Sequence, residues 1–190
     1  MLRTFWHYLG ETQPRLLRVV HILIAALVIG QIINSNATQV EAITDISAGL
    51  LVFLCTWLHI IAGSVLVILG FALLFYVLAL RGFRYYFAWL LGDFSGIVKD
   101  LRTLAHFHLP EASAGGIAAT VQGLGVGALL LVALSGSIGV ALYLMGYAVG
   151  FNVIHWHKFL TGLIEVYIFA HGAMGLLHFA LRQFLPVKRE

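Results

Sequence analysis

Four long apolar runs restrict this chain to a fold that spans a membrane. A bilayer needs about 20 consecutive apolar residues for each helix that crosses it. Of the 190 residues, 61% are hydrophobic and only 10% are charged, whereas a soluble domain carries about 25% charged residues. The runs cover residues 16–33, 46–80, 117–145 and 157–181. We therefore predict an all-α integral membrane protein, folded as a single four-helix bundle domain over residues 1–190.

The second run leaves two interpretations open. Its 35 residues are more than one crossing of a bilayer needs. Either its helix projects beyond the membrane, or its first part, residues 46–54, lies along the membrane interface.

Basic residues lie almost entirely on one side of these runs. The connection at 34–47 contains no Lys or Arg, and only Lys158 lies near the connection between the third and fourth runs. The other ten basic residues are Arg3, Arg15, Arg18, Arg81, Arg84, Lys99, Arg102, Arg182, Lys188 and Arg189. Because Lys and Arg are retained on the cytoplasmic side, both termini are predicted to be cytoplasmic. The net charge of +3 reflects this topology and gives no reason to propose nucleic-acid binding.

The cytoplasmic connection at 82–116 combines aromatic, apolar and charged residues. An aromatic segment at 83–90 is followed by Ile97, Val98, Leu101 and Leu104 beside charged residues. This pattern predicts an interfacial amphipathic helix. It could anchor the protein on the membrane surface or serve as a docking surface for a cytoplasmic partner.

Four histidines fall at two depths of the predicted bundle. His157 and His171 are fourteen residues apart on one run, so they face within about 40° of each other and lie about 21 Å apart along the helix. On the predicted topology, His59 lies at the depth of His157 (the outer pair) and His21 at the depth of His171 (the inner pair). Each pair takes one imidazole from each of two helices, which is the axial ligation of a b-type haem.

Imidazole alone does not select haem, because it also suits zinc, copper and nickel. A single histidine within a span could equally make a hydrogen bond between helices. The surroundings favour haem, since no second carboxylate or cysteine accompanies either pair and small residues leave room for a flat cofactor. The chain has no CxxCH motif, which argues against covalently attached haem.

Three further residues in the fourth run need an interpretation. His155 competes with His157 but lies about 160° away from His171 around the helix. His178, seven residues after His171, returns to its direction and could be an interfacial polar residue or a contact for a haem propionate or quinone. Glu165, between the two depths, is expected inside the bundle, either packed as a neutral group or active in a proton relay.

The histidine arrangement resembles the bacterial cytochrome b561 family and the related b-type cytochrome subunits of nickel-iron hydrogenases and formate dehydrogenases. The resemblance is most specific at 157–162, 171–174 and His178. The third run departs from some members, because it lacks their histidines near its start and has Gln122 in that region. The 82–116 connection is longer and more aromatic than in the shortest members, and is closer to that of the hydrogenase and dehydrogenase subunits.

The resemblance implies two b haems in a bacterial inner-membrane protein, with quinone as one redox partner. His21 and His171 would hold the cytoplasmic haem, His59 and His157 the periplasmic haem, and His178 would lie near a quinone region. We expect electron transfer between the quinone pool and a periplasmic cytochrome or a dehydrogenase or hydrogenase subunit. The alternatives are a stand-alone superoxide:quinone oxidoreductase, for which Lys158 is the main outer cation, and a non-redox transporter or assembly factor.

Overall fold

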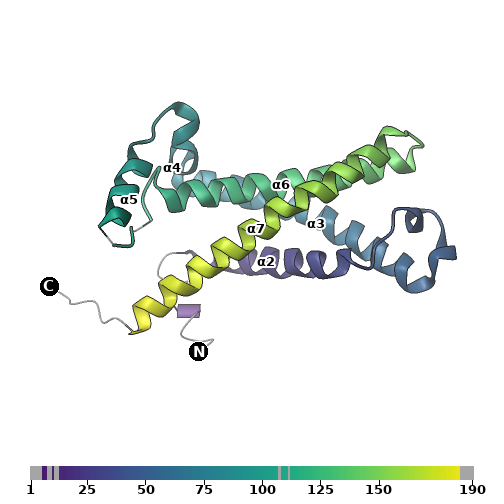
Figure 1. The fold of residues 1–190 in the computed structure, drawn as a ribbon, viewed down its shortest axis with the longest axis horizontal. Helices are drawn as coiled ribbons and strands as arrows, with labels where there is room; N and C mark the ends of the chain where they lie inside the picture. Colours follow the sequence, from purple (N-terminus) through teal and green to yellow (C-terminus); the bar gives the residue numbers. More distant parts are fainter. Residues whose placement is uncertain (1–5, 8–9, 11–12, 107, 111, 185–190) are drawn as a thin grey trace.

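Four long helices form the framework of the protein (Figure 1). The computed structural model describes residues 6–7, 10, 13–106, 108–110 and 112–184. Within these residues every regular element is helical. The long helices are α2 (Arg15–Ser35), α3 (Leu50–Arg81), α6 (Ile117–Leu144) and α7 (Val149–Phe184). All four are long and apolar enough to cross a membrane, so the predicted all-α, multi-pass architecture is confirmed.

Two helix starts differ from the predicted limits. Residues Ile46–Ala48 form a separate short turn, η2, and Gly49 adopts φ +107° before α3 begins at Leu50, a conformation that residues with a Cβ avoid. Helix α3 still has 32 residues, about 48 Å. Helix α7 begins at Val149, eight residues earlier than expected, because Gly146 at φ +80° turns the chain within a few residues of α6.

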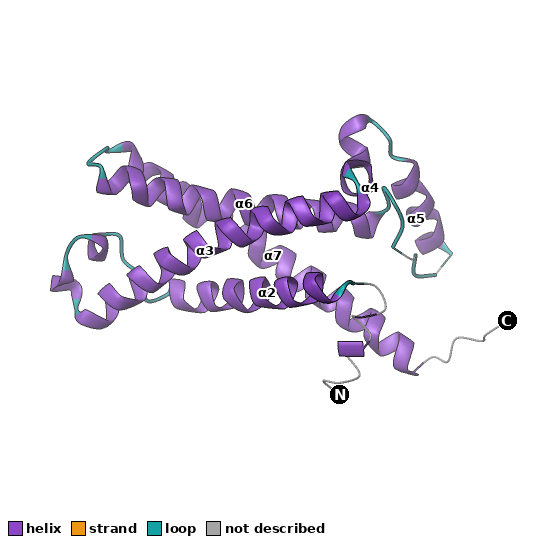
Figure 2. Ribbon diagram, turned by 180° about the vertical axis from the view of Figure 1, so that it is seen from behind, coloured by secondary structure: helices purple, strands orange, loops and turns teal. Residues whose placement is uncertain are grey.

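The helices place the connections at two opposite ends of the protein. One end holds the start of α2, the finish of α3 and α7, and the short helices α4 (Phe83–Phe87), η3 (Ala88–Leu91) and α5 (Ser95–Ala105) (Figure 2). The opposite end holds the α2–α3 connection, with η1 (Glu41–Ile43) and η2, and the α6–α7 turn.

Because of this arrangement, most of the described basic residues lie at the same end of the protein as α5. The described basic side chains at the α5 end are Arg15, Arg18, Arg81, Arg84, Lys99 and Arg102. Arg3, Lys188 and Arg189 lie outside the described residues, and the side chain of Arg182 is not described. That this end faces the cytoplasm remains a prediction.

Apolar side chains from all four long helices meet in one central cluster. It contains Ile24 and Val28 from α2, Leu66 from α3, Leu129 and Ala133 from α6, and Ile164 from α7. Small residues of α6 bring α7 close: a Cβ at Gly125 would overlap the Tyr167 ring, and a Cβ at Gly139 would lie 2.8 Å from Ile154. Such small residues let membrane helices approach closely.

Helix α5 in the 82–116 connection is held against the start of α6. The carboxylate of Asp100, only 3% exposed, accepts a 2.7 Å hydrogen bond from the backbone N–H of Ile117. The first N–H groups of a helix have no partner within it, and a carboxylate there is also favoured by the helix dipole. Asp100 therefore holds α5, which is the amphipathic helix expected from the sequence, against the bundle.

We expect Asp100→Ala to lower the free energy of unfolding by about 1 kcal/mol, because the N–H of Ile117 at the start of α6 would lose its acceptor. Asp100→Asn is the matched control, since its amide oxygen can still accept the hydrogen bond. Thermal unfolding in detergent, followed by circular dichroism, measures both. Equal losses in the two variants would contradict the role of this hydrogen bond.

Candidate functional site: two histidine pairs

The inner pair joins α2 to α7. The ring centres of His21 and His171 lie 5.8 Å apart, with their planes inclined by 46°. Both rings are half-buried. Tyr167, four residues before His171 on the same helix, stacks on it at 5.1 Å with nearly parallel planes. The Tyr167 ring is itself packed against Gly125 of α6, so α6 helps to fix the orientation of His171.

The outer pair joins α3 to α7. The ring centres of His59 and His157 are 6.3 Å apart, with planes inclined by 75°. Nδ1 of His157 lies 2.9 Å from the carbonyl oxygen of Val132 and 3.3 Å from Oγ of Ser135. Because a carbonyl oxygen only accepts hydrogen bonds, Nδ1 carries the proton and donates it. This leaves Nε2 of His157 as the nitrogen that could bind a metal.

The partner ring of the outer pair is less fully hydrogen-bonded. Nδ1 of His59 is buried and has no hydrogen-bond partner. Its backbone is held instead, because Nε2 of Gln31 on α2 donates a 2.7 Å hydrogen bond to the His59 carbonyl. A buried polar atom without a partner is costly, and only a group bound at Nδ1 itself would offset this cost.

The spacing of both pairs suits one metal atom between two imidazoles. An imidazole nitrogen lies about 2 Å from a metal that it binds and about 1 Å from the centre of its own ring. Two imidazoles that bind one metal from opposite sides therefore have ring centres about 6 Å apart. The observed separations are 5.8 and 6.3 Å. Among the described residues, no group of three or more His, Cys, Asp or Glu side chains could hold a metal ion. Two imidazoles alone are too few for zinc but suit the axial positions of haem iron.

An apolar layer separates the two pairs. Ile24, Leu66 and Ile164 of the central cluster lie between the inner and outer pairs along α2, α3 and α7, respectively. Each of these side chains is 7% exposed or less. The two pairs are therefore distinct sites, each at its own depth in the bundle.

The comparison with known families decides what the bundle is. The sequence model of prokaryotic cytochrome b561 matches residues 12–188. The chain belongs to the prokaryotic cytochrome b561 family. It is thus a multi-pass protein of the bacterial inner membrane, which binds b-type haem and transfers electrons. No curated protein and no solved structure gives a match.

The remaining histidines of this cytochrome b561 lie apart from the two pairs. His155 is exposed, whereas His157 is half-buried, in agreement with the rotation expected from the sequence. His178 is half-buried on the last turns of α7. Its Nδ1–H donates a 2.9 Å hydrogen bond to the carbonyl of Met174, so Nε2 is the nitrogen left for other contacts.

Glu165 does not lie where it was expected. Its side chain is exposed on the outer surface of α7 instead of inside the bundle. The physical reason is rotation: Glu165 lies about 80° from His157 around the helix, and the packed face of α7 follows His157, Ile164 and His171. An exposed carboxyl at this depth would meet lipid, where a negative charge is costly.

Sequence reasoning missed the residues that support the ligand candidates. These are Tyr167, Val132, Ser135 and Gly136. Tyr167 had a usable signal, since it lies four residues before His171 and must share its face. The three α6 residues had none, because their register against α7 depends on contacts between helices.

We expect Gly136→Ala to bind less haem than the wild type. A Cβ at this position would lie 2.9 Å from Cε1 of His157, so the ring would have to leave the position in which it faces His59. Gly127→Ala on the same helix is the control, since no atom lies within 4 Å of the added Cβ. The ratio of haem to protein, from the pyridine haemochrome spectrum, measures the effect. An unchanged ratio in Gly136→Ala would contradict the proposed importance of this close packing.

Proposed function

We propose that this cytochrome is a di-haem protein that carries electrons between the quinone pool and a periplasmic redox partner. His21 and His171 hold one haem, and His59 and His157 hold the second. The main support is the 5.8 and 6.3 Å separation of the two pairs, each of which takes one ring from α7. Haem iron supplies reversible one-electron chemistry, and two imidazoles would fill both of its axial positions.

The protein's own residues hold and tune these ligands. A hydrogen bond from the non-ligating nitrogen of a histidine fixes its tautomer and orientation and strengthens the other nitrogen as a donor. The Val132 carbonyl and the Ser135 hydroxyl act in this way on His157. Tyr167 restricts the His171 ring by stacking. The two pairs therefore have different environments, which supports two haems of different potential.

The basic end of the bundle is the cytoplasmic end in this proposal. The inner pair then lies towards the cytoplasm and the outer pair towards the periplasm. His178 lies seven residues, or about two turns, beyond His171 on the same face of α7, and in this proposal it contacts quinone or a haem propionate. The periplasmic partner is a cytochrome or a subunit of a dehydrogenase or hydrogenase.

A superoxide:quinone oxidoreductase is the second candidate. The observation that favours it is Lys158, an exposed cation next to His157 at the outer end of α7. Rapid mixing of the oxidised protein with superoxide, with and without a superoxide scavenger, separates the two functions. For the electron-relay function we expect no haem reduction beyond the scavenged control; faster reduction would favour the second candidate.

We expect His171→Ala and His157→Ala each to remove one haem of two, because each deletes one axial ligand of one pair. His155→Ala is the matched control, as it removes an exposed imidazole two residues from His157. The number of haems per chain is measured from the pyridine haemochrome spectrum and the protein concentration.

Three results would contradict the assignment. The first is two haems per chain in His171→Ala or His157→Ala. The second is loss of a haem in His155→Ala. The third is a colourless wild-type protein without the α-band of reduced b haem, which would support a transporter or assembly factor instead.

A further inference from the structure

Helix α5 presents three different strips along its length. One strip packs on the protein: Asp100 is bonded to Ile117, and a Cβ at Gly96 would clash with the backbone of Gly115. The second strip is apolar and open, with Phe94 52% and Leu101 54% exposed. The third strip is basic and consists of Lys99 and Arg102. At about 100° per residue, the basic strip adjoins the apolar one on the side of the helix away from Asp100.

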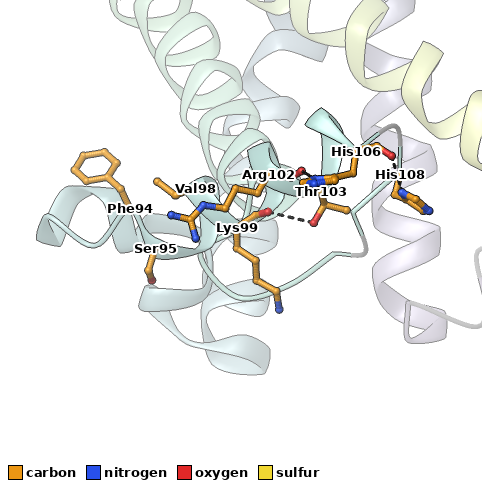
Figure 3. A pocket seen from close by; sticks show the side chains of 8 residues that line it. All are labelled: Phe94, Ser95, Val98, Lys99, Arg102, Thr103, His106 and His108. Carbon is orange, nitrogen blue, oxygen red and sulfur yellow. Dashed lines mark hydrogen bonds between the residues drawn. The ribbon is translucent and has the colours of Figure 1, made fainter.

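The basic strip borders an open hollow of about 700 Å³ (Figure 3). Its lining includes the apolar Phe94 and Val98, the cationic Lys99 and Arg102, and the imidazoles of His106 and His108. Figure 3 shows the Arg102 side chain reaching along the helix towards Val98, so a cation lies directly beside apolar surface. A ligand of this hollow would meet both kinds of surface at once.

The hydrogen bonds of the two imidazoles orient them. Nδ1–H of His106 donates to the carbonyl of Arg102, and Nδ1–H of His108 donates to the carbonyl of His106, each at 2.7 Å. In both rings Nε2 is left for other contacts. The rings are thus held beside the cations by the chain that follows α5.

Two described carboxylates near the basic strip, Asp93 and Asp100, are engaged with other groups. The carboxylate of Asp100 is buried and accepts the hydrogen bond from the N–H of Ile117. Asp93 accepts hydrogen bonds from the hydroxyl and the N–H of Ser95, at 2.6 and 3.1 Å. These bonds, together with the charge of Arg84, hold the pKa of Asp93 below its usual value. Asp93 therefore stays charged at the start of α5 but is already bonded, which leaves Lys99 and Arg102 for an added anion.

We propose that this hollow binds the phosphate headgroup of an anionic phospholipid, with an acyl chain lying against the apolar strip. Lys99 and Arg102 supply charge-assisted hydrogen bonds to phosphate oxygens, and amphipathic helices with such strips lie at the boundary of headgroups and acyl chains. A free phosphate ion would use only the cations. A ligand that is both anionic and apolar would also contact the exposed Phe94, Val98 and Leu101 beside them.

Binding of a fluorescent phosphatidylglycerol to the full-length haem-loaded protein in neutral detergent tests the proposal, with labelled phosphatidylcholine as the zwitterionic comparison. We expect preference for phosphatidylglycerol. Each cation contributes about fivefold in affinity for an anionic lipid, so Lys99→Gln with Arg102→Gln should weaken binding about thirtyfold. Lys99→Arg with Arg102→Lys keeps both charges and should retain most of the affinity. Lys158→Gln, which removes one exposed cation at the opposite end, should change nothing.

A second arm separates a lipid from a free anion. Excess inorganic phosphate or glycerol 3-phosphate should not displace the lipid, and Val98→Ser with Leu101→Ser should weaken binding although all charges remain. Equal binding of the two lipids, an unchanged affinity in the Lys99 and Arg102 double variant, or displacement by inorganic phosphate would overturn the proposal. The α-band recorded on the same samples tests haem binding separately, so failure of the lipid site and of the haem assignment can be distinguished.

Discussion

The close contact between α6 and α7 determines where both histidine pairs lie. Helix α7 contributes His157 to one pair and His171 to the other, yet most of its remaining surface is exposed. Its position therefore depends on the glycines of α6, which receive Tyr167 and Ile154, and on the hydrogen bond from His157 to Val132. A larger residue in this seam would displace the ring that each pair needs from α7.

The sequence contained enough information for the four spans and the pairing of the histidines. Helical periodicity placed His157 and His171 on one face and His155 on another, and charge asymmetry set which histidines share a depth. The sequence could not show where α7 starts, because this depends on the turn at Gly146. It also could not show that the Glu165 side chain points outward. Nor could it find Ser135 and Gly136, because contacts between helices have no signature in the spacing along one helix. The ligands themselves remain a prediction.

The exposed surface shows that lipid is part of what stabilises the protein. Val166 and Phe169 on α7 are 72% and 81% exposed, and comparable apolar surface in water would be penalised at about 25 cal/mol for each Å². The two ends of the bundle differ in chemistry. The basic α5 end offers cations beside apolar side chains, whereas the opposite end carries Glu41 and Asp45. The proposed haem ligands in the interior and the proposed lipid site at the α5 end therefore use separate residues.

The position of α7 along the chain also bears on how the protein is assembled. Helices α2 and α3 precede α7 in the sequence, so His21 and His59 leave the ribosome with no facing imidazole. Each gains its partner only when the fourth helix inserts, since α7 carries both missing rings. Domains fold from the N-terminus during synthesis, but here the last helix completes both sites together. With the proposed ligands, uptake of haem at either pair would report that the whole bundle has been made and inserted.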